Sequence, residues 1–350
     1  MQFVIALLLF PLSVFYGIIT KVRNLLFNFH ILKSKHHNKQ DLLVISVGNI
    51  RAGGTGKTPF VEYLLNSLKA NHHIAVISRG YGRKTKGFRI INDTDTAKSV
   101  GDEPLQMYRK FNHDALFAVS EDRVTAIENI TSSFPDISLI ILDDAFQHRY
   151  AQSDISFLLT AYSKPFFKDF VIPFGYLREY RSGYRRADYI VVTKTPSITQ
   201  AQKAKIITQI KPLPAQQVFF SNITYKEPYL ISNPDVKINN LQDHSVILLS
   251  GIADNQPLIS YLASQTQLLE VISFKDHHKF SPADLQTIKH KIETQQKPNT
   301  ILITTEKDAT RLDDSFIELI ATAVYVISIE FEMDETFNAV KQSLNRGHLI

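Results

Sequence analysis

Short apolar runs alternate with stretches of helical periodicity along most of this chain. An apolar run of about four to eight residues is typical of a buried strand, and strands separated by helices are typical of a mostly parallel sheet with helices on both faces. The pattern therefore predicts an α/β fold. In the first part of the chain the predicted strands are residues 42–47, 74–78, 116–119, 139–142, 155–159 and 189–193.

A second series of strands follows a polar stretch that runs from residue 215 to about residue 244. The apolar runs beyond it predict strands at residues 245–249, 268–274 and 300–304. This polar stretch comes directly after Lys211-Pro212-Leu213-Pro214, and we expect a hinge within it, near residues 215–240. The predicted parts are an N-terminal segment, 1–35, a core, 36–220, and a smaller α/β domain, 221–350.

The N-terminal segment contains no charged residue between Phe3 and Ile19. Basic residues follow it, namely Lys21, Arg23, Lys33, Lys35 and Lys39. This order predicts a membrane contact with the rest of the chain on the cytoplasmic side. The apolar stretch is short for a bilayer span, which needs about 20 residues, so an interfacial helix, a true span and a buried helix all stay open.

Composition narrows the class of protein. A chain of 350 residues with 44% hydrophobic content can form two packed α/β domains. The absence of cysteine excludes a disulfide framework and a thiolate metal site, and it fits a reducing, cytoplasmic setting. The net charge of +5 favours anionic lipids or phosphorylated substrates. No nucleic-acid-reading motif and no sign of an obligate protein partner is present, so neither partner is expected.

A glycine-rich turn after the first predicted core strand has the pattern of a phosphate-binding loop. The segment 42–58 reads LLVISVGNIRAGGTGKT, an apolar strand followed by the turn and then by a predicted helix at 59–68. Backbone N–H groups in such a turn surround phosphate oxygens, a lysine reaches the β- and γ-phosphates, and a threonine hydroxyl ligates magnesium. The expected residues are Gly53, Gly54, Thr55, Gly56, Lys57 and Thr58.

Arg51 stands where the strict pattern G-x-x-x-x-G-K-[ST] has its first glycine. Gly53 and Gly54 are then expected to supply the flexibility of the turn. The sequence still predicts binding of ATP or GTP with magnesium.

A second apolar strand delivers two carboxylates at its C-terminal end, Asp143 and Asp144. Ligands of an open parallel sheet gather at the carboxyl ends of its strands. We therefore expect Asp143 and Thr58 to approach the same magnesium ion from adjacent strands.

Two further acidic segments carry candidate chemistry. Asp102 and Glu103 sit in a turn before a predicted helix, where acidic residues often serve only as helix caps. The segment Asp276-His277-His278 could be an ordinary solvated loop. From the residues alone, these alternatives stay open.

Eight short motifs follow one another along the chain: 47–49 (VGN), 53–59 (GGTGKTP), 78–83 (SRGYGR), 101–104 (GDEP), 143–149 (DDAFQHR), 177–179 (LRE), 276–278 (DHH) and 305–309 (TEKDA). With these motifs in this order, the chain resembles the tetraacyldisaccharide 4'-kinases, which phosphorylate the lipid A precursor in Gram-negative bacteria. The resemblance covers nearly the whole chain. That family's phosphate loop also lacks the first glycine, and its members carry an apolar N-terminal segment that associates with the inner membrane.

The resemblance implies roles for the carboxylates and for the late histidine. Asp102, paired with His277, would accept the proton of a sugar 4'-hydroxyl, and the two residues would meet across a cleft between domains. Lys57 would stabilise the β- and γ-phosphates. The implied magnesium ligands are Thr58, Asp143 and Glu103, with Asp144 nearby.

The resemblance also implies which residues recognise the sugar headgroup. They are Arg79, Tyr81, Arg123 and His148, and the arginines could clamp the 1-phosphate. An ordinary surface or core role stays open for each of them.

One residue departs from the family pattern, and the role of one motif stays open. Ala145 stands where the family usually has glycine, and its methyl group requires an ordinary backbone conformation or a local rearrangement. Residues 305–308 could contact the nucleotide, brace the cleft or form a surface ion pair.

The expected function is transfer of the ATP γ-phosphate to the 4'-hydroxyl of a tetraacylated glucosamine disaccharide 1-phosphate, with Mg2+. The expected location is the cytoplasmic face of the bacterial inner membrane, with the lipid substrate and the membrane surface as partners. Two rivals remain: another phosphate-loop small-molecule kinase or ligase, and a membrane-recruited nucleotide switch.

Overall fold

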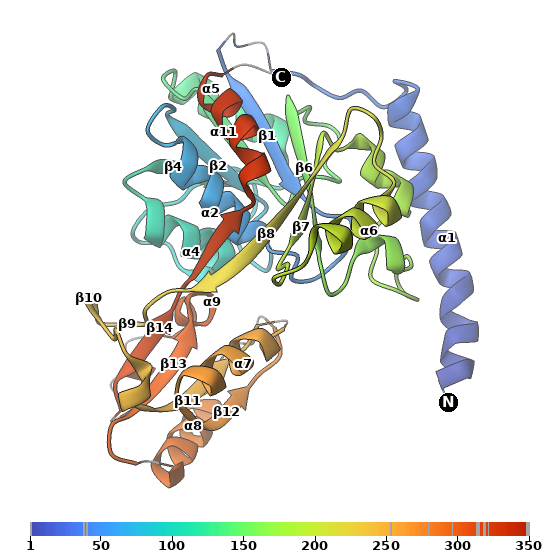
Figure 1. The fold of residues 1–350 in the computed structure, drawn as a ribbon. Coiled ribbons are helices and arrows are strands. Elements are labelled where there is room, and N and C mark those ends of the chain that lie inside the picture. The colour runs from blue at the N-terminus through green and yellow to red at the C-terminus, as the bar shows by residue number, and fades with distance from the viewer. Residues whose placement is uncertain are drawn as a thin grey trace.

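The structure is a computed structural model, which describes residues 2–347 except 38, 40, 253, 277, 279, 296, 313–315, 318, 319 and 321. Two sheets organise the chain, with the smaller sheet below the larger one in Figure 1. The larger sheet has nine strands in the order β15-β8-β7-β6-β1-β5-β2-β4-β3. Its strands are β1 Leu43–Gly48, β2 Ile74–Ser78, β3 Arg89–Ile90, β4 Ala115–Val119, β5 Leu139–Asp143, β6 Ile155–Ala161, β7 Tyr189–Thr193, β8 Gln217–Tyr225 and β15 Ile329–Met333.

The larger sheet is parallel from β8 to β4, and only its outer strands β3 and β15 run antiparallel to their neighbours. The fully buried strands β1 and β5 read as near-continuous apolar runs because both faces are covered. The predicted α/β class with a mostly parallel sheet is confirmed.

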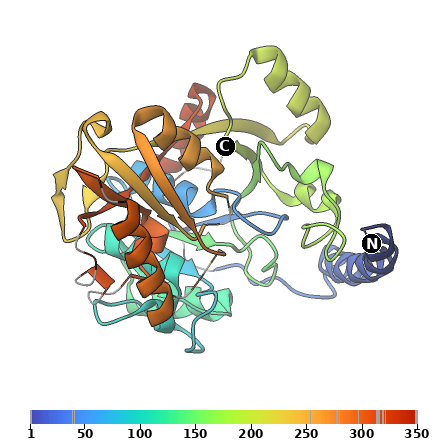
Figure 2. The same ribbon diagram turned by 90° about the horizontal axis from the view of Figure 1, so that it is seen from below.

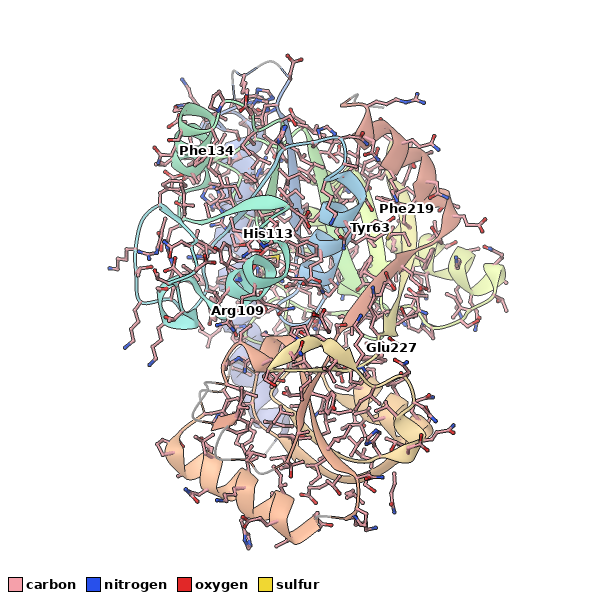
Figure 3. The ribbon with its side chains drawn as sticks, turned by 90° about the vertical axis from the view of Figure 1, so that its left-hand side faces the viewer. Tyr63, Arg109, His113, Phe134, Phe219 and Glu227 are labelled. Carbon is pink, nitrogen blue, oxygen red and sulfur yellow. The ribbon has the colours of Figure 1, made fainter. Side chains whose placement is uncertain are left out.

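Helices cover both faces of the larger sheet. One face packs against α2 (Lys57–Leu68), α4 (Asp102–Phe111) and α11 (Asn338–Asn345), and the other packs against α5 (Arg123–Ser133) and α6 (Gln200–Ile210). The face of α2 and α11 holds an aromatic cluster centred on Phe337. Tyr63 and Phe219, labelled in Figure 3, both lie against that ring, with centroid distances of 5.9 Å and 5.1 Å. A short helix, α3 (Ala97–Val100), precedes α4.

The smaller sheet has six strands in the order β10-β9-β14-β13-β11-β12. Strands β14, β13, β11 and β12 run parallel to one another and pack against α7 and α8, whereas β9 and β10 run antiparallel to their neighbours. The elements are β9 Tyr229–Leu230, β10 Asn233–Lys237, β11 Ser245–Ser250, α7 Gln256–Gln265, β12 Gln267–Ser273, α8 Pro282–Gln295, β13 Thr300–Thr305, α9 Glu306–Ala309 and β14 Val324–Ile327.

The chain crosses between the sheets twice. It leaves the larger sheet after β8, near Glu227 in Figure 3, and returns at Ser328 between β14 and β15. Sheet membership therefore assigns residues 221–225 and 329–333 to the larger domain, and α11 packs on the same domain, whereas the sequence prediction placed all of 221–350 in the smaller one. The prediction misses this return because apolar periodicity marks a strand without naming the sheet that it joins.

The N-terminal segment is a 27-residue helix, α1 (Gln2–Asn28), at the side of the molecule away from the smaller sheet in Figure 2. One stripe of α1 docks on the larger domain, where Ser13 Oγ donates to the carbonyl of Val171 and Asn24 Nδ2 donates to Glu179 Oε2. The other side exposes Phe10, Leu12, Val14, Phe15, Ile18, Ile19, Val22 and Leu25. Within the described part of the chain, no helix combines the length and the apolar character that a membrane crossing requires.

Candidate active site

The loop after β1 has the backbone of a phosphate-binding turn. Gly53 and Gly56 have φ angles of 97° and 80°, a left-handed conformation that favours glycine. Gly54 does not share it, so the flexibility expected of both neighbouring glycines is used only at Gly53. Gly56 immediately precedes α2, and no side chain caps the first N–H groups of that helix. These N–H groups and the positive end of the helix dipole suit an anion.

Arg51 is held by the segment that follows residue 168. Its Nε donates to Asp169 Oδ2 at 2.7 Å, and its guanidinium lies 4.7 Å from the centroid of the Tyr176 ring. The absent first glycine therefore leaves a side chain that anchors the start of the loop.

Asp143 ends β5, which pairs directly with β1, so the predicted adjacency of Asp143 to the phosphate loop is confirmed. Its side chain is buried, Oδ2 accepts from Ser78 Oγ at 3.0 Å, and Oδ1 has no hydrogen-bond partner among the described residues. Burial, reinforced by the charges of Glu103 and Asp144, raises the pKa of Asp143 to about 6. A buried oxygen without a partner and surplus negative charge fit a divalent cation, and Mg2+ prefers such oxygen ligands.

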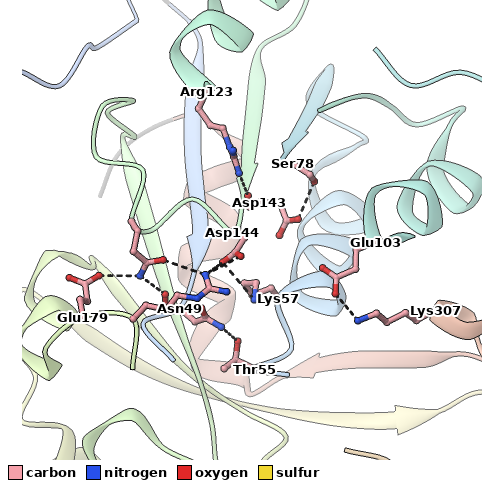
Figure 4. Close-up of polar contacts among 12 residues, drawn as sticks. Asn49, Thr55, Lys57, Ser78, Glu103, Arg123, Asp143, Asp144, Glu179 and Lys307 are labelled. Atoms are coloured by element: carbon pink, nitrogen blue, oxygen red, sulfur yellow. Dashed lines mark hydrogen bonds and ion pairs between the residues drawn. The ribbon is translucent and has the colours of Figure 1, made fainter. Parts of the chain in front are cut away.

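Asp144 has a different environment. Its carboxylate lies 3.7 Å from Lys57 Nζ and accepts from Arg178 Nη1 at 2.9 Å and 3.0 Å (Figure 4). Burial opposes ionisation, but Lys57 and Arg178 outweigh it and lower the pKa of Asp144. Asp144 thus holds two cations beside the loop, whereas Asp143 keeps an oxygen free for a metal.

Ala145 is accommodated without strain. The left-handed conformation falls on Asp144, with φ of 47°, and Ala145 has no positive φ. The buried methyl group joins the core beneath β5. The departure from glycine therefore alters packing and leaves Asp143 and Asp144 in place.

Asp102 and Glu103 form the first turn of α4, and Gly101, with φ of 94°, precedes it. Asp102 is buried, and its Oδ1 accepts from the Glu103 N–H at 3.1 Å. Gly101 occupies the N-cap position itself, but both carboxylates stand in the first turn and Asp102 accepts one of its N–H groups, so a role at the helix N-terminus agrees with the structure. His277 lies outside the described residues, so its pairing with Asp102 stays a prediction.

The segment 305–308, which had no assigned role, reaches across from the smaller domain. Lys307 Nζ lies 3.0 Å from Glu103 Oε1, and Arg311 Nε lies 3.4 Å from Asp102 Oδ2 (Figure 4 shows the first pair). Both predicted carboxylates of the first domain therefore face cations of the second. The signal that could have found this segment is its position directly after a predicted strand.

A second ion-pair chain lies beside the first. Lys110 Nζ lies 2.6 Å from Glu62 Oε2 and 3.1 Å from Glu306 Oε1, so it joins α2, α4 and α9. Burial raises the pKa of Glu62 to about 7, and Lys110 opposes the rise. These contacts show that α9 is a principal contact between the domains.

A cavity of about 570 Å³ opens beside the carboxylates. It is lined by Asp102, Glu103 and Asp143 together with all four predicted headgroup residues, Arg79, Tyr81, Arg123 and His148. No residue of α1 was predicted to belong to the site, yet Tyr16, Thr20, Arg23 and Asn24 also line the cavity. The sequence signal for them is their helical spacing, which places the four residues on one stripe of α1.

The headgroup candidates differ in freedom. Arg123 is 2% exposed and donates to the carbonyls of Ser120 at 2.8 Å and Asp143 at 3.2 Å, so it stabilises the end of β5, where the proposed metal ligand Asp143 lies. Burial and the nearby Arg123 lower the pKa of His148. Tyr81 is 74% exposed at the rim. Arg79 and Tyr81 are therefore the more accessible pair for a ligand.

A phosphate loop, a buried carboxylate at the end of the adjacent strand and a cavity beside that carboxylate, lined by several charged side chains, define a phosphate-loop phosphotransferase. A model of the tetraacyldisaccharide-1-P 4'-kinase family matches residues 5–346. The chain belongs to this family.

Individual proteins agree with the family model. The tetraacyldisaccharide 4'-kinase of Bacteroides thetaiotaomicron is 39% identical, covering 93% of this chain and 88% of the relative. That of Flavobacterium johnsoniae is 41% identical, covering 88% of each. The crystal structure of LpxK from Aquifex aeolicus in complex with ATP matches with a TM-score of 0.76 at 27% identity, covering 97% of this chain and 98% of that one. The resemblance noted from the sequence motifs is confirmed.

Proposed function

We propose that this chain transfers the γ-phosphate of ATP to the 4'-hydroxyl of a tetraacylated glucosamine disaccharide 1-phosphate, a step of lipid A biosynthesis. Family membership supports the reaction, and the ATP complex of LpxK from Aquifex aeolicus supports the nucleotide. The observation that carries the proposal is that the phosphate loop and Asp143 follow adjacent strands, and that Asp143 lines one cavity together with Asp102.

The proposed chemistry is an in-line displacement. The 4'-oxygen forms a bond to the γ-phosphorus, the bond from that phosphorus to the β,γ-bridging oxygen breaks, and ADP leaves. Asp102, oriented with His277, accepts the hydroxyl proton. Lys57, which Asp144 holds at 3.7 Å, stabilises negative charge on the β- and γ-phosphates.

Mg2+, when bound, neutralises charge on the phosphate oxygens. We propose Thr58, Asp143 and Glu103 as its protein ligands, with Asp144 nearby. Glu103 pairs with Lys307 through Oε1, which leaves Oε2 for the ion. The unpartnered Oδ1 of Asp143 is the strongest support for this set.

The cavity lining supports a phosphorylated sugar as the acceptor. Arg79, which follows β2, and Arg23, on α1, both line the cavity, and arginines bind phosphate oxygens in a bidentate manner. We propose that they hold the 1-phosphate, and that Tyr81 and His148 contact the sugar rings.

We propose that the exposed face of α1 binds the cytoplasmic face of the inner membrane. Leu12 and Phe15 are 57% and 66% exposed, and a contiguous row of exposed large apolar side chains is unusual on a protein surface. A helix of this kind lies in the interface with its apolar face in the lipid.

Replacing Phe15 and Ile18 by serine should lower partitioning onto phospholipid vesicles by a factor on the order of ten or more, because burial of each large apolar side chain is worth about 1.5–3 kcal/mol. Sedimentation with vesicles measures the bound fraction. The matched control replaces Leu213 and Val236, exposed apolar residues away from α1, by serine. Equal partitioning of both variants would show that another surface makes the contact.

Transfer of labelled γ-phosphate from ATP to the tetraacyldisaccharide 1-phosphate in mixed micelles tests the reaction. We expect labelled lipid with the wild type and none above background with Lys57→Ala. Release of phosphate without labelled lipid would favour another phosphate-loop enzyme. Nucleotide binding without turnover would favour a membrane-recruited switch.

A further inference from the structure

The nucleoside half of ATP needs a place on the side of the phosphate loop away from the acceptor. Strand order sets the two sides, because β5 and β2 flank β1 on one side and β6 and β7 flank it on the other. Most of the lining of the acceptor cavity, including Asp143 and the residues that follow β2 and β4, comes from the β5 side. The γ-phosphate must face that cavity for transfer, so the nucleoside extends toward the ends of β6 and β7.

The end of β7 is tied directly to the phosphate loop. Thr193, its last residue, donates from Oγ1 to the carbonyl of Thr55 at 2.9 Å. Lys194 follows immediately, at the carboxyl edge of the sheet where ligands bind. Lys194 therefore lies next to the phosphate loop, on the β6 and β7 side of β1, where we expect the nucleoside.

Lys194 lacks the partners that a lysine in this position normally has. It is partly buried, and its ammonium makes no hydrogen bond or ion pair with any residue that the structure describes. Burial lowers its pKa, and the charge of Asp254, in the loop of the smaller domain that follows β11, opposes the change. A desolvated cation without a partner costs free energy in the folded state.

The backbone of Lys194 is also strained. Its φ of 55° lies in the left-handed region, which a long side chain seldom adopts. Asp144, at the end of β5, has the same kind of conformation, with φ of 47°. Strained backbone conformations are more frequent at functional sites, where they orient a side chain toward a ligand.

We propose that Lys194 is a nucleotide-binding residue that contacts the nucleoside half of ATP. Its ammonium donates a hydrogen bond to an acceptor on the ribose or base, and its methylene stem packs against the nucleoside. The triphosphate already has the loop N–H groups and Lys57. This proposal rests on the proposed function, in that it takes ATP to be bound at the phosphate loop.

Displacement of a fluorescent ATP analogue by two competitors, ATP and inorganic tripolyphosphate, each with Mg2+, tests the proposal. For Lys194→Met we expect ATP affinity to fall about tenfold or more, as for loss of a charged hydrogen bond, with tripolyphosphate affinity within about twofold of the wild type. The matched control is Lys205→Met, an exposed lysine of α6, which should change neither. An equal loss for both competitors would place Lys194 at the phosphates, and no loss for ATP would remove it from the site.

Two further readouts separate the possible failures. Lys57→Ala should weaken both competitors, and if it weakens neither, the proposed nucleotide site itself is wrong. The Tm of nucleotide-free Lys194→Met should equal or exceed that of the wild type, because the variant loses an unpaired buried charge. A clearly lower Tm would show that Lys194 has a structural role instead.

Discussion

Asp102→Asn should lower kcat by a factor on the order of 10²–10⁴ and leave the KM for ATP within about threefold of the wild type. The expected loss is that of a general base. Asparagine keeps an oxygen for the Glu103 N–H but cannot accept the hydroxyl proton. Kinetics of phosphate transfer to the lipid in mixed micelles measure both constants.

The control for this substitution is Asp95→Asn. Asp95 is likewise a buried acidic residue near a helix N-terminus, that of α3, but it pairs with Arg89 and is not among the residues that line the cavity. We expect its kcat per folded molecule to stay near that of the wild type. Wild-type kcat in Asp102→Asn would remove Asp102 from the mechanism, and equal losses in both variants would indicate a general effect on folding.

Asp143→Asn should lower kcat by a factor on the order of a thousand and at the same time stabilise the metal-free protein near neutral pH. The first effect follows because a proposed metal ligand loses its charge. The second follows from burial, which raises the pKa of the Asp143 carboxyl to about 6 in the folded chain. Its ionisation opposes folding, on the order of 2–3 kcal/mol once pH exceeds the folded pKa.

The pH dependence has a defined direction. The folded carboxyl binds its proton more tightly than the unfolded one, so this group makes metal-free wild type lose stability as pH rises from about 4 through about 6, with no further loss above. Thermal unfolding in EDTA should show the Tm difference between Asp143→Asn and wild type growing from pH 5 to pH 7. Mg2+ should then raise the Tm of wild type more than that of the variant.

The Ser78→Ala variant is the matched comparison. It removes the hydrogen bond that Asp143 Oδ2 accepts and keeps the carboxylate charge. We expect a smaller loss of kcat and no gain in metal-free stability. An Asp143→Asn protein that is less stable than wild type in EDTA at pH 7 would contradict the inference that burial of the ionised Asp143 carboxylate destabilises the metal-free protein.

Much of the larger domain could be predicted from apolar periodicity. Ile74–Ser78 and Tyr189–Thr193 match the predicted strands, and β1 differs by one residue at each end. Buried parallel strands are continuous apolar runs, so their signal is local. The return of β15 to the larger sheet was missed, because pairing between Ile329–Met333 and β8 joins segments about a hundred residues apart.

The residues of the candidate site also fall into two groups, those that the sequence predicted and those that only the structure revealed. The phosphate loop and Asp143 were predictable because a glycine turn and a strand-end carboxylate are each encoded in a few consecutive residues. Lys307 and Arg311 were not, because their role depends on which carboxylates the smaller domain meets. No local pattern encodes that meeting.

The sequence by itself determined the fold class, the phosphate loop, the metal-side carboxylate and, through its motifs, the family. Only the tertiary structure decided which charges face one another across the domains, how α1 lines the acceptor cavity, and that Lys194 stands beside the loop without an ion pair to any described residue. The physical reason is the range of the information. Backbone conformation and burial follow from neighbouring residues, whereas the partner of a charge depends on strand order and on how separate elements pack.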